Sequence, residues 1–186
     1  MMTELDKLRY FYRLKSVDRH NSQGSRKESS AEHTWSCLIL ADYFFSKIKQ
    51  KLDRVKVYKM LMYHDLVEIE EGDVNILHEE KRKNKKEIEL KAAELITQKI
   101  PSSLSKKYLT LFQEYEEQKT LEARFCKAID ALDAEIHEMD YKQDWKSWTE
   151  EFLRCKKEPL FVDFPEIQEL FEETIKHVRK EGYFEQ

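Results

Sequence analysis

Apolar residues recur every three or four positions along most of the chain, which is the spacing of amphipathic helices. Leu5, Leu8 and Tyr12 form the first such stripe and predict a helix over residues 4–15. The same spacing predicts further helices over about 29–48, 53–72, 84–99, 102–117, 120–139, 144–158 and 166–181. We therefore expect an all-α fold, a single-domain helical bundle.

Local signals fix some helix ends and leave one gap in the pattern. Ser29 followed by Glu32 is a capping-box signature, so a helix should begin there. Residues 18–30 are polar and show no helical period, and a segment of that kind is either disordered or functional. No strand-like alternation stands out anywhere in the chain. The mixed-charge run at 79–90 is typical of a solvated helix face or loop.

Composition supports this interpretation and narrows the possible classes. The chain has 186 residues, three glycines, three prolines and 38% charged residues, which favours helices around one core. The net charge of −4 gives no reason to expect a nucleic-acid polymer as partner. No apolar run reaches the roughly 18 residues of a membrane span, and the first residues lack the order of a signal peptide. The cysteines are far apart, which argues against disulfides and a thiolate zinc site, so we expect a cytoplasmic protein.

The stretch from Tyr63 to Asp73 carries the densest candidate chemistry. His64 and Glu68 lie one helical turn apart and share a face that is otherwise apolar. A polar group that points into a core costs free energy unless it finds a partner, and a divalent metal is a suitable partner for imidazole and carboxylate. Because a His-Asp pair such as His64-Asp65 also occurs by chance, this interpretation needs further ligands elsewhere.

Two other helices supply such residues. His33 lies on the apolar face of the helix that starts near residue 29, where a hydrogen-bonded core histidine is the alternative. Asp130 lies in the middle of the helix over 120–139, next to its apolar stripe, where a solvated edge position is the alternative. The candidate metal ligands are therefore His33, His64, Asp65 and Asp130.

The order and spacing of these residues resemble the HD-domain metal-dependent phosphohydrolases, whose pattern is H…HD…D. The similarity is close to the bacterial 5′-deoxynucleotidases and the HD domain-containing protein 2 family, and it covers most of the chain. The matching segments are Leu14-Lys15 with Arg19, Ser30-Ala31-Glu32-His33, Tyr63-His64-Asp65-Leu66-Val67-Glu68 with Gly72-Asp73, and Lys127-Ala128-Ile129-Asp130.

The resemblance implies one HD domain over 1–186, with a metal-site core at about 29–140 and C-terminal helices at about 144–182. It implies one divalent ion, which could be Mn, Co, Fe, Ni or Zn, held by the four candidate ligands. Glu68 would position or activate water, and Asp73 would act near the leaving sugar oxygen. Arg19 matches the family's phosphate-binding arginine, and Lys127 and Arg26 are weaker candidates for that role.

The implied reaction is release of phosphate from a (deoxy)nucleoside 5′-monophosphate, and a homodimer is expected. His20 stands where the bacterial enzymes have a bulky aromatic that excludes a ribose, so strict deoxy selectivity is in question. One alternative is another small phosphomonoester, or a cyclic or polyphosphorylated nucleotide, as substrate. A second alternative is a non-catalytic metal-containing binding protein.

Further histidines do not suggest a second metal. His78 does not fall at the required spacing, and His137 lies about 10 Å along the helix from Asp130. For His137 and the neighbouring Asp133, packing or surface hydrogen bonding is the expected role.

Overall fold

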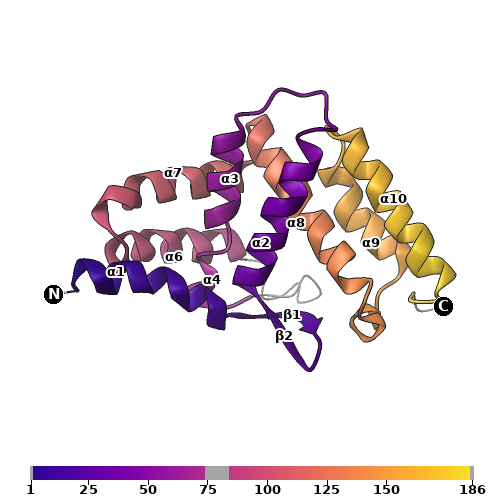
Figure 1. Cartoon of the computed structure of the whole chain (residues 1–186), viewed down its shortest axis with the longest axis horizontal. Helices are drawn as coiled ribbons and strands as arrows, with labels where there is room; N and C mark the ends of the chain where they lie inside the picture. Colours follow the sequence, from indigo (N-terminus) through magenta and orange to yellow (C-terminus); the bar gives the residue numbers. More distant parts are fainter. Residues whose placement is uncertain (1, 74–83, 185–186) are drawn as a thin grey trace.

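The computed structural model describes residues 2–73 and 84–184, and it confirms the all-α fold and the single domain. Figure 1 shows the helices arranged along a long axis, with a small two-stranded sheet at one edge. In chain order the elements are α1 (Glu4–Phe11), η1 (Tyr12–Ser16), β1 (Asp18–Gln23), β2 (Arg26–Ser29), α2 (Ser30–Phe44), α3 (Arg54–Tyr63), α4 (Glu68–Glu71), α6 (Lys85–Lys99), α7 (Ser102–Glu117), α8 (Leu121–Glu138), η2 (Lys142–Trp145), α9 (Glu150–Lys157), η3 (Glu158–Leu160) and α10 (Pro165–Lys180).

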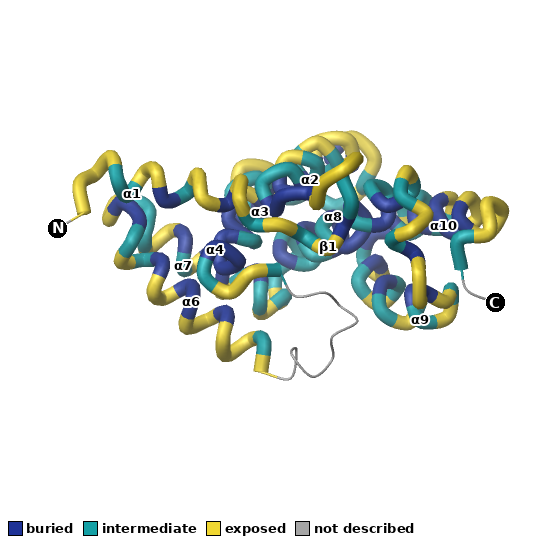
Figure 2. The backbone as a smooth tube through the Cα atoms, turned by 90° about the horizontal axis from the view of Figure 1, so that it is seen from below, coloured by how far each residue is buried: buried dark blue, intermediate teal, exposed yellow. Residues whose placement is uncertain are grey.

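The helices α2, α3 and α8 form the centre of the molecule. α8 packs against α2 and α3 in the middle, against α7 on one side and against α10 on the other. The core side chains Phe44, Leu61 and Phe125 are almost fully buried there. Figure 2 shows the buried residues concentrated where these three helices meet, with exposed residues on the outer faces.

Several predicted helix ends are confirmed. The Ser29 hydroxyl accepts a hydrogen bond from the Glu32 N–H at the start of α2, and the Glu32 carboxylate accepts one from the Ser29 N–H. Thr120 caps α8 in the same way, through the N–H of Ala123. These caps satisfy backbone donors that the helix itself leaves open.

The segment before α2 corrects the sequence prediction. Residues expected to lack regular structure form an antiparallel hairpin, β1–β2, in which Asp18 pairs with Ser29 and Gln23 with Arg26. Gly24 takes a positive φ of 62° in the turn, a conformation that glycine adopts without strain. The strands are polar on both faces, so they lack the alternation by which a half-buried strand is recognised.

The first helix is present, but its predicted apolar stripe faces solvent. Leu5, Leu8 and Tyr12 are 66%, 46% and 63% exposed, whereas Tyr10 and Leu14 are buried. Both sets have helical spacing, so the pattern alone predicts the helix but not the face that packs. The hydroxyl of Tyr10 donates to Glu70 at 2.6 Å, which ties this helix to α4.

Three further details differ from the prediction. The helix expected over 53–72 ends at Tyr63, turns through residues 64–67 and resumes as α4. Leu95 belongs to the apolar stripe that predicts the helix over 84–99, yet it is 41% exposed. The helix expected over 144–158 is divided into η2 and α9, separated by Ser147 at φ 71°. His78 and the charged residues 79–83 lie outside the described part of the chain.

Candidate metal centre

The four predicted ligands converge on one point. His33 extends from α2, His64 and Asp65 lie in the turn after α3, and Asp130 extends from the middle of α8. The Nε2 atom of His33 lies 3.2 Å from Asp130 Oδ1 and 3.7 Å from Asp65 Oδ2. The Nε2 atom of His64 lies 3.2 Å from Asp65 Oδ1. Packing of three central helices therefore brings together residues up to 97 positions apart in the sequence.

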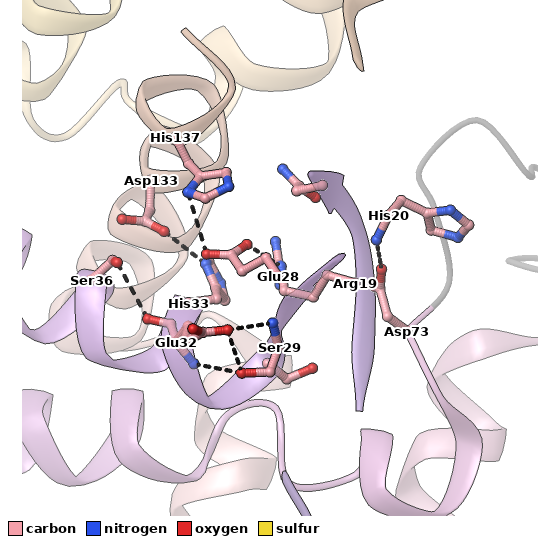
Figure 3. A network of polar contacts seen from close by, with 12 residues as sticks. Arg19, His20, Glu28, Ser29, Glu32, His33, Ser36, Asp73, Asp133 and His137 are labelled. Carbon is pink, nitrogen blue, oxygen red and sulfur yellow. Dashed lines mark hydrogen bonds and ion pairs between the residues drawn. The ribbon is translucent and has the colours of Figure 1, made fainter. Parts of the chain in front are cut away.

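Hydrogen bonds to Nδ1 fix the tautomers of both histidines. His64 Nδ1 donates to the carbonyl oxygen of Leu61 at 2.6 Å. His33 Nδ1 donates to Asp133 Oδ2 at 2.7 Å, as Figure 3 shows. Each Nε2 therefore presents a lone pair to carboxylate oxygens in the neutral imidazole form, and such groups repel each other unless a cation lies between them.

Two atoms at this point are buried without a hydrogen-bond partner among the described residues: His64 Nε2 and Asp65 Oδ2. An unpartnered buried polar atom costs roughly 1–3 kcal/mol, more if it is charged. Two neutral imidazoles and two carboxylates are a donor set that suits a divalent ion and neutralises its charge. The residues present therefore fit a divalent metal.

The pKa values of three of these residues are shifted in different directions. Burial lowers the pKa of His64. Burial and Arg19 act in the same direction on His33, but Cys37, Asp130 and Asp133 outweigh them and raise its pKa. Burial opposes ionisation of Asp130, yet Lys127 and the two histidines hold the pKa of that carboxyl well below its usual range.

Cys37 is a neighbour that the sequence did not single out as a ligand. Its sulfur lies 3.6 Å from His33 Nε2, and the donor atoms of Cys37, His33 and His64 lie within 4.8 Å of one another. Burial raises the pKa of the Cys37 thiol to about 12, so the thiol keeps its proton when no metal is bound. Glu28, His33 and Asp133 also cluster, but Asp133 there accepts the Nδ1 proton and so orients His33.

The hairpin holds Arg19 beside the four ligands. Arg19 Nε lies 3.1 Å from Glu28 Oε2, and Arg19 Nη1 lies 3.6 Å from Asp65 Oδ2. Burial disfavours the cation, but Asp65, Glu68 and Glu28 together raise the pKa of Arg19. Glu28 is almost fully buried and also lies 3.5 Å from Nδ1 of His137 (Figure 3). Glu28 therefore orients the Arg19 guanidinium through its Nε atom.

Glu68 and Asp73 lie on the other side of Arg19. The hydroxyl of Ser30 donates to Glu68 Oε2 at 2.5 Å. Burial, with Asp65 and Asp73 nearby, raises the pKa of Glu68 to about 8. Asp73 Oδ2 accepts a hydrogen bond from the backbone N–H of His20 at 3.2 Å (Figure 3). Glu68 can therefore exchange a proton near neutral pH, as a general base must.

Tyr115 and Lys127 surround Asp130 from α7 and α8. The Tyr115 hydroxyl donates to Asp130 Oδ2 at 2.6 Å, and its ring packs edge-on against His64, with centroids 5.5 Å apart. Lys127 Nζ lies 2.9 Å from the Tyr115 oxygen and 3.2 Å from Asp130 Oδ2. Arg26 instead pairs with Glu32 on the surface and does not join the site.

A cavity of about 580 Å³ opens from this centre, and its wall contains every predicted site residue except His33 and the weaker candidate Arg26. Its lining from the predicted set is Arg19, His20, His64, Asp65, Glu68, Asp73, Lys127 and Asp130. Its remaining wall includes side chains of α6, α7, the far half of α8 and α9. His33 lies behind the cavity, where it is completely buried.

The sequence did not predict the contacts of Glu28, Asp133 and Tyr115. Asp133 follows Asp130 by three positions in a row of polar residues beside the apolar stripe, and that row was a usable signal for the hydrogen bond to His33. Glu28 and Tyr115 carry no local signal, because their contacts depend on how the hairpin and α7 pack against α8.

A family model for the HD domain matches residues 11–168. The chain belongs to the HD-domain family. The HD domain is a helical fold, and a divalent metal is implied for this HD domain. Among the described residues, no helix is both long and apolar enough to span a membrane.

Two groups of known proteins are similar to this HD domain. The 5′-deoxynucleotidase HDDC2 of Xenopus laevis is 29% identical over 125 residues, or 65% of this chain and 59% of that protein. The human 5′-deoxynucleotidase HDDC2 is 31% identical over 122 residues, which are 63% of this chain and 56% of that protein. The chain thus spans less than two thirds of the length of these relatives. A crystal structure from Magnetospirillum magnetotacticum, of a predicted metal-dependent phosphohydrolase, is 27% identical with a TM-score of 0.76 and covers 97% of both chains.

Proposed function

We propose that this HD domain is a metal-dependent 5′-nucleotidase that releases phosphate from (deoxy)nucleoside 5′-monophosphates. One observation carries the proposal: two histidine Nε2 atoms and two carboxylates face one point in the wall of a cavity that also holds Arg19 and Glu68. The similarity to the HDDC2 5′-deoxynucleotidases supports the substrate class.

We assign the metal to His33, His64, Asp65 and Asp130. Imidazole and carboxylate ligands admit Mn, Co, Fe, Ni or Zn, and the affinity order alone does not choose among them. A divalent ion at such a site lowers the pKa of bound water and polarises a phosphate oxygen.

Arg19 is the residue we assign to the phosphate. A phosphate dianion is repelled by the acids of the site, so it needs a cation beside it. The guanidinium is planar and can bind two phosphate oxygens at once, and Glu28 holds its Nε end in place. Lys127 lies in the cavity wall beside Asp130 and adds a second positive charge.

Glu68 and Asp73 are the residues we assign to proton transfer and to the sugar. A Glu68 carboxylate oxygen accepts the proton of the attacking water, while Ser30 holds Oε2 in place. Asp73 lies beside the backbone of His20 at the cavity wall. From that position it donates a proton to the departing sugar oxygen or binds a sugar hydroxyl. His20 is smaller than the aromatic of the bacterial enzymes, so we expect weak discrimination against ribose.

The test is phosphate release from a panel of 5′-deoxynucleotides and 5′-ribonucleotides after metal stripping and addition of single metals. Asp65→Ala should lose both bound metal, measured by elemental analysis, and turnover. Glu68→Gln should keep the metal and lose turnover. Glu87→Gln, a change at an exposed helix position, is the control and should behave like the wild type.

A metal-loaded protein that releases no phosphate from any nucleoside 5′-monophosphate would contradict the proposal. Hydrolysis of other phosphomonoesters, or of cyclic or polyphosphorylated nucleotides, would retain the chemistry and change the substrate. Metal binding without any hydrolysis would favour a binding protein.

We also propose a homodimer that uses the outer face of α2. Trp35, Ile39 and Tyr43 repeat every four residues there and are 64%, 56% and 50% exposed. A two-fold axis at Ile39 would place Trp35 of one subunit against Tyr43 of the other, as a self-complementary interface requires. Sedimentation of the wild type and Ile39→Glu tests this; a monomeric wild type would contradict it.

The three cysteines are unpaired, which is typical of a reducing compartment, and we therefore propose a cytoplasmic location. Fractionation of cells that express the tagged chain tests this.

A further inference from the structure

The cavity extends away from the metal centre along β1 and α8. At the near end, Arg19 of β1 and Asp130 of α8 both line the cavity. Two residues further along β1, Asn21 Nδ2 donates to Glu138 Oε1 at 2.9 Å. Glu135 and Glu138 lie five and eight residues beyond Asp130, about 7.5 and 12 Å along the helix axis. This range is comparable to the distance from the phosphate to the base in a nucleoside monophosphate.

The far end of the cavity is polar and enclosed. Its residues, which we call the distal cluster, are each less than 9% exposed and all contribute to the cavity wall. The distal cluster consists of Asn21, Glu135, Glu138, Trp148 and Lys157. Such a concentration of buried polar groups is expensive unless each group finds a partner.

The partners within the distal cluster leave one acceptor unused. Lys157 Nζ donates to the carbonyl oxygen of Ala131 at 3.1 Å and pairs with Glu135 Oε1 at 2.9 Å. The other carboxylate oxygen, Glu135 Oε2, is buried without a hydrogen-bond partner among the described residues. Glu135 is only 2% exposed but contributes to the cavity wall, so a small side-chain adjustment would bring Oε2 into contact with a ligand there. The cavity thus offers an acceptor to a ligand that carries a hydrogen-bond donor.

Charge at the distal cluster indicates the chemistry of its occupant. Lys157 offsets the charge of Glu135, and burial, with Glu135 nearby, raises the pKa of Glu138. The far end therefore carries little net charge and suits a neutral group. The Trp148 ring provides an apolar wall beside these acceptors. A flat ring system with an amino group at its edge matches both features, and carboxylates accept hydrogen bonds from exocyclic amino groups of bases.

We infer that the distal cluster binds the nucleobase and selects bases with an exocyclic amino group over their oxo counterparts. The inference rests on the proposed nucleotidase function, with the phosphate at Arg19 and the base at Glu135. The amino N–H donates to Glu135 Oε2. An oxo base places an acceptor at the same position and leaves two acceptors facing each other.

Two substrate pairs provide the test, in which an oxo group replaces the amino group and the adjacent ring nitrogen gains a proton. Deoxycytidine and deoxyuridine 5′-monophosphate form one pair, and deoxyadenosine and deoxyinosine 5′-monophosphate form the other. We expect kcat/KM to favour the amino member of each pair by about tenfold, which is typical of one well-placed hydrogen bond to a base. Binding of the same nucleotides to metal-free protein, measured by calorimetry, should show the same order without turnover.

Glu135→Gln is the decisive variant. Its amide oxygen can stay with Lys157, and its amide N–H₂ group then replaces Oε2, so a donor stands where the acceptor was. The amino-to-oxo ratio should collapse to about one or invert. A purely structural loss would lower kcat/KM for both members equally and leave the ratio unchanged. Glu89→Gln alters a buried glutamate of the cavity wall that comes from α6 and pairs with Lys85, and it should keep the wild-type ratio.

The outcomes separate this inference from the proposed function. Hydrolysis with a wild-type ratio near one, or with a ratio that Glu135→Gln leaves unchanged, overturns the base subsite and keeps the nucleotidase. Absence of hydrolysis overturns the nucleotidase. If no hydrolysis occurs, calorimetry still tests the base subsite. Tighter binding of the amino member, lost in Glu135→Gln, supports the subsite. Equal binding of the two members overturns the subsite as well as the nucleotidase.

Discussion

Two arginines, Arg154 on α9 and Arg19 on β1, lie in contrasting networks of acids. Arg154 donates to Glu150 at 2.8 Å, to Glu158 at 2.6 Å and to Glu172 at 2.6 and 2.9 Å. Arg19 has ion pairs with Glu28 and Asp65 at 3.1 and 3.6 Å, and its buried Nε has no hydrogen bond of good geometry among the described residues.

The difference separates a structural network from one prepared for a ligand. The chain's own carboxylates saturate Arg154 near the surface, so that arginine has little capacity left for anything else. Arg19 is nearly buried, its two ion pairs are longer than those of Arg154, and it lines the cavity. Incomplete buried networks are costly, and proteins retain them chiefly at functional sites.

Substituting lysine for Arg19 and for Arg154 should give the largest difference, because only the change at Arg19 should lower kcat/KM. Arg19→Lys keeps the charge among the acids but loses the planar fork, so kcat/KM for nucleotides should fall by about 100-fold or more, with little change in melting temperature. Arg154→Lys should leave kcat/KM unchanged and reduce stability by about 1 kcal/mol, because several partly exposed ion pairs are weakened. Steady-state kinetics and thermal unfolding of the two variants measure these effects. An equal loss of kcat/KM in both variants would contradict the distinction between a structural and a ligand-binding arginine.

Substitution of Asp133 should weaken metal binding rather than phosphate binding. Asp133→Asn weakens the bond that orients His33, so metal affinity should fall about 10- to 100-fold, as for other carboxylates behind a histidine ligand. Competition with a chelator measures this affinity. The matched control is Asp163→Asn, which weakens the ion pair with Arg124 away from the cavity and should leave metal affinity unchanged.

Two tyrosines on α7 give a closer comparison. Tyr115→Phe removes the hydroxyl that donates to Asp130, so we expect about tenfold weaker metal binding and a matching shift of the metal concentration needed for half-maximal activity. Tyr108→Phe removes a buried hydroxyl that has no hydrogen-bond partner among the described residues, and it should change neither. Similar losses in both variants would show that α7 packing, not the hydroxyl, positions the metal site.

The helices and the convergence of the four predicted ligands follow from the sequence for separate reasons. Helical spacing and capping residues act locally, so α2, α7 and α8 begin and end close to their predicted limits. His33, His64 and Asp130 were recognisable because each is a polar residue on or beside an apolar stripe. This signal comes from the helical pattern alone and does not depend on which metal binds.

Features that depend on packing between elements could not be predicted in this way. The hairpin around Arg19 is polar on both faces, so its strands lack a recognisable pattern. The face of α1 that packs is set by contacts such as Tyr10 with Glu70, 60 residues away. Tyr115 and Glu28 acquire their contacts only when α7 and the hairpin meet the central helices.

Glu68 should make the metal-free protein less stable as the pH rises. Its folded-state pKa of about 8 is above the unfolded value of 4.5, so the folded state holds the proton more tightly. Its unfavourable contribution therefore begins above pH 4.5 and becomes complete near pH 8. Glu68→Gln should remove it and raise the unfolding free energy at pH 8 by on the order of 5 kcal/mol, with little effect at pH 4.5. A constant difference across this range would contradict the raised pKa.

Glu150, in the Arg154 network, should show the opposite sign and the smallest effect. Hydrogen bonds from Arg179 and Arg154 lower the pKa of Glu150 to about 2, below its unfolded value of 4.5. Its stabilising contribution is therefore complete above pH 4.5 and is lost as the pH falls towards 2. Glu150→Gln should reduce stability by less than about 1 kcal/mol at pH 7, because the pair is partly exposed, and the difference from wild type should vanish near pH 2. Urea unfolding at several pH values measures this, and because Glu150 is far from the cavity, metal affinity serves as the internal control that should not change.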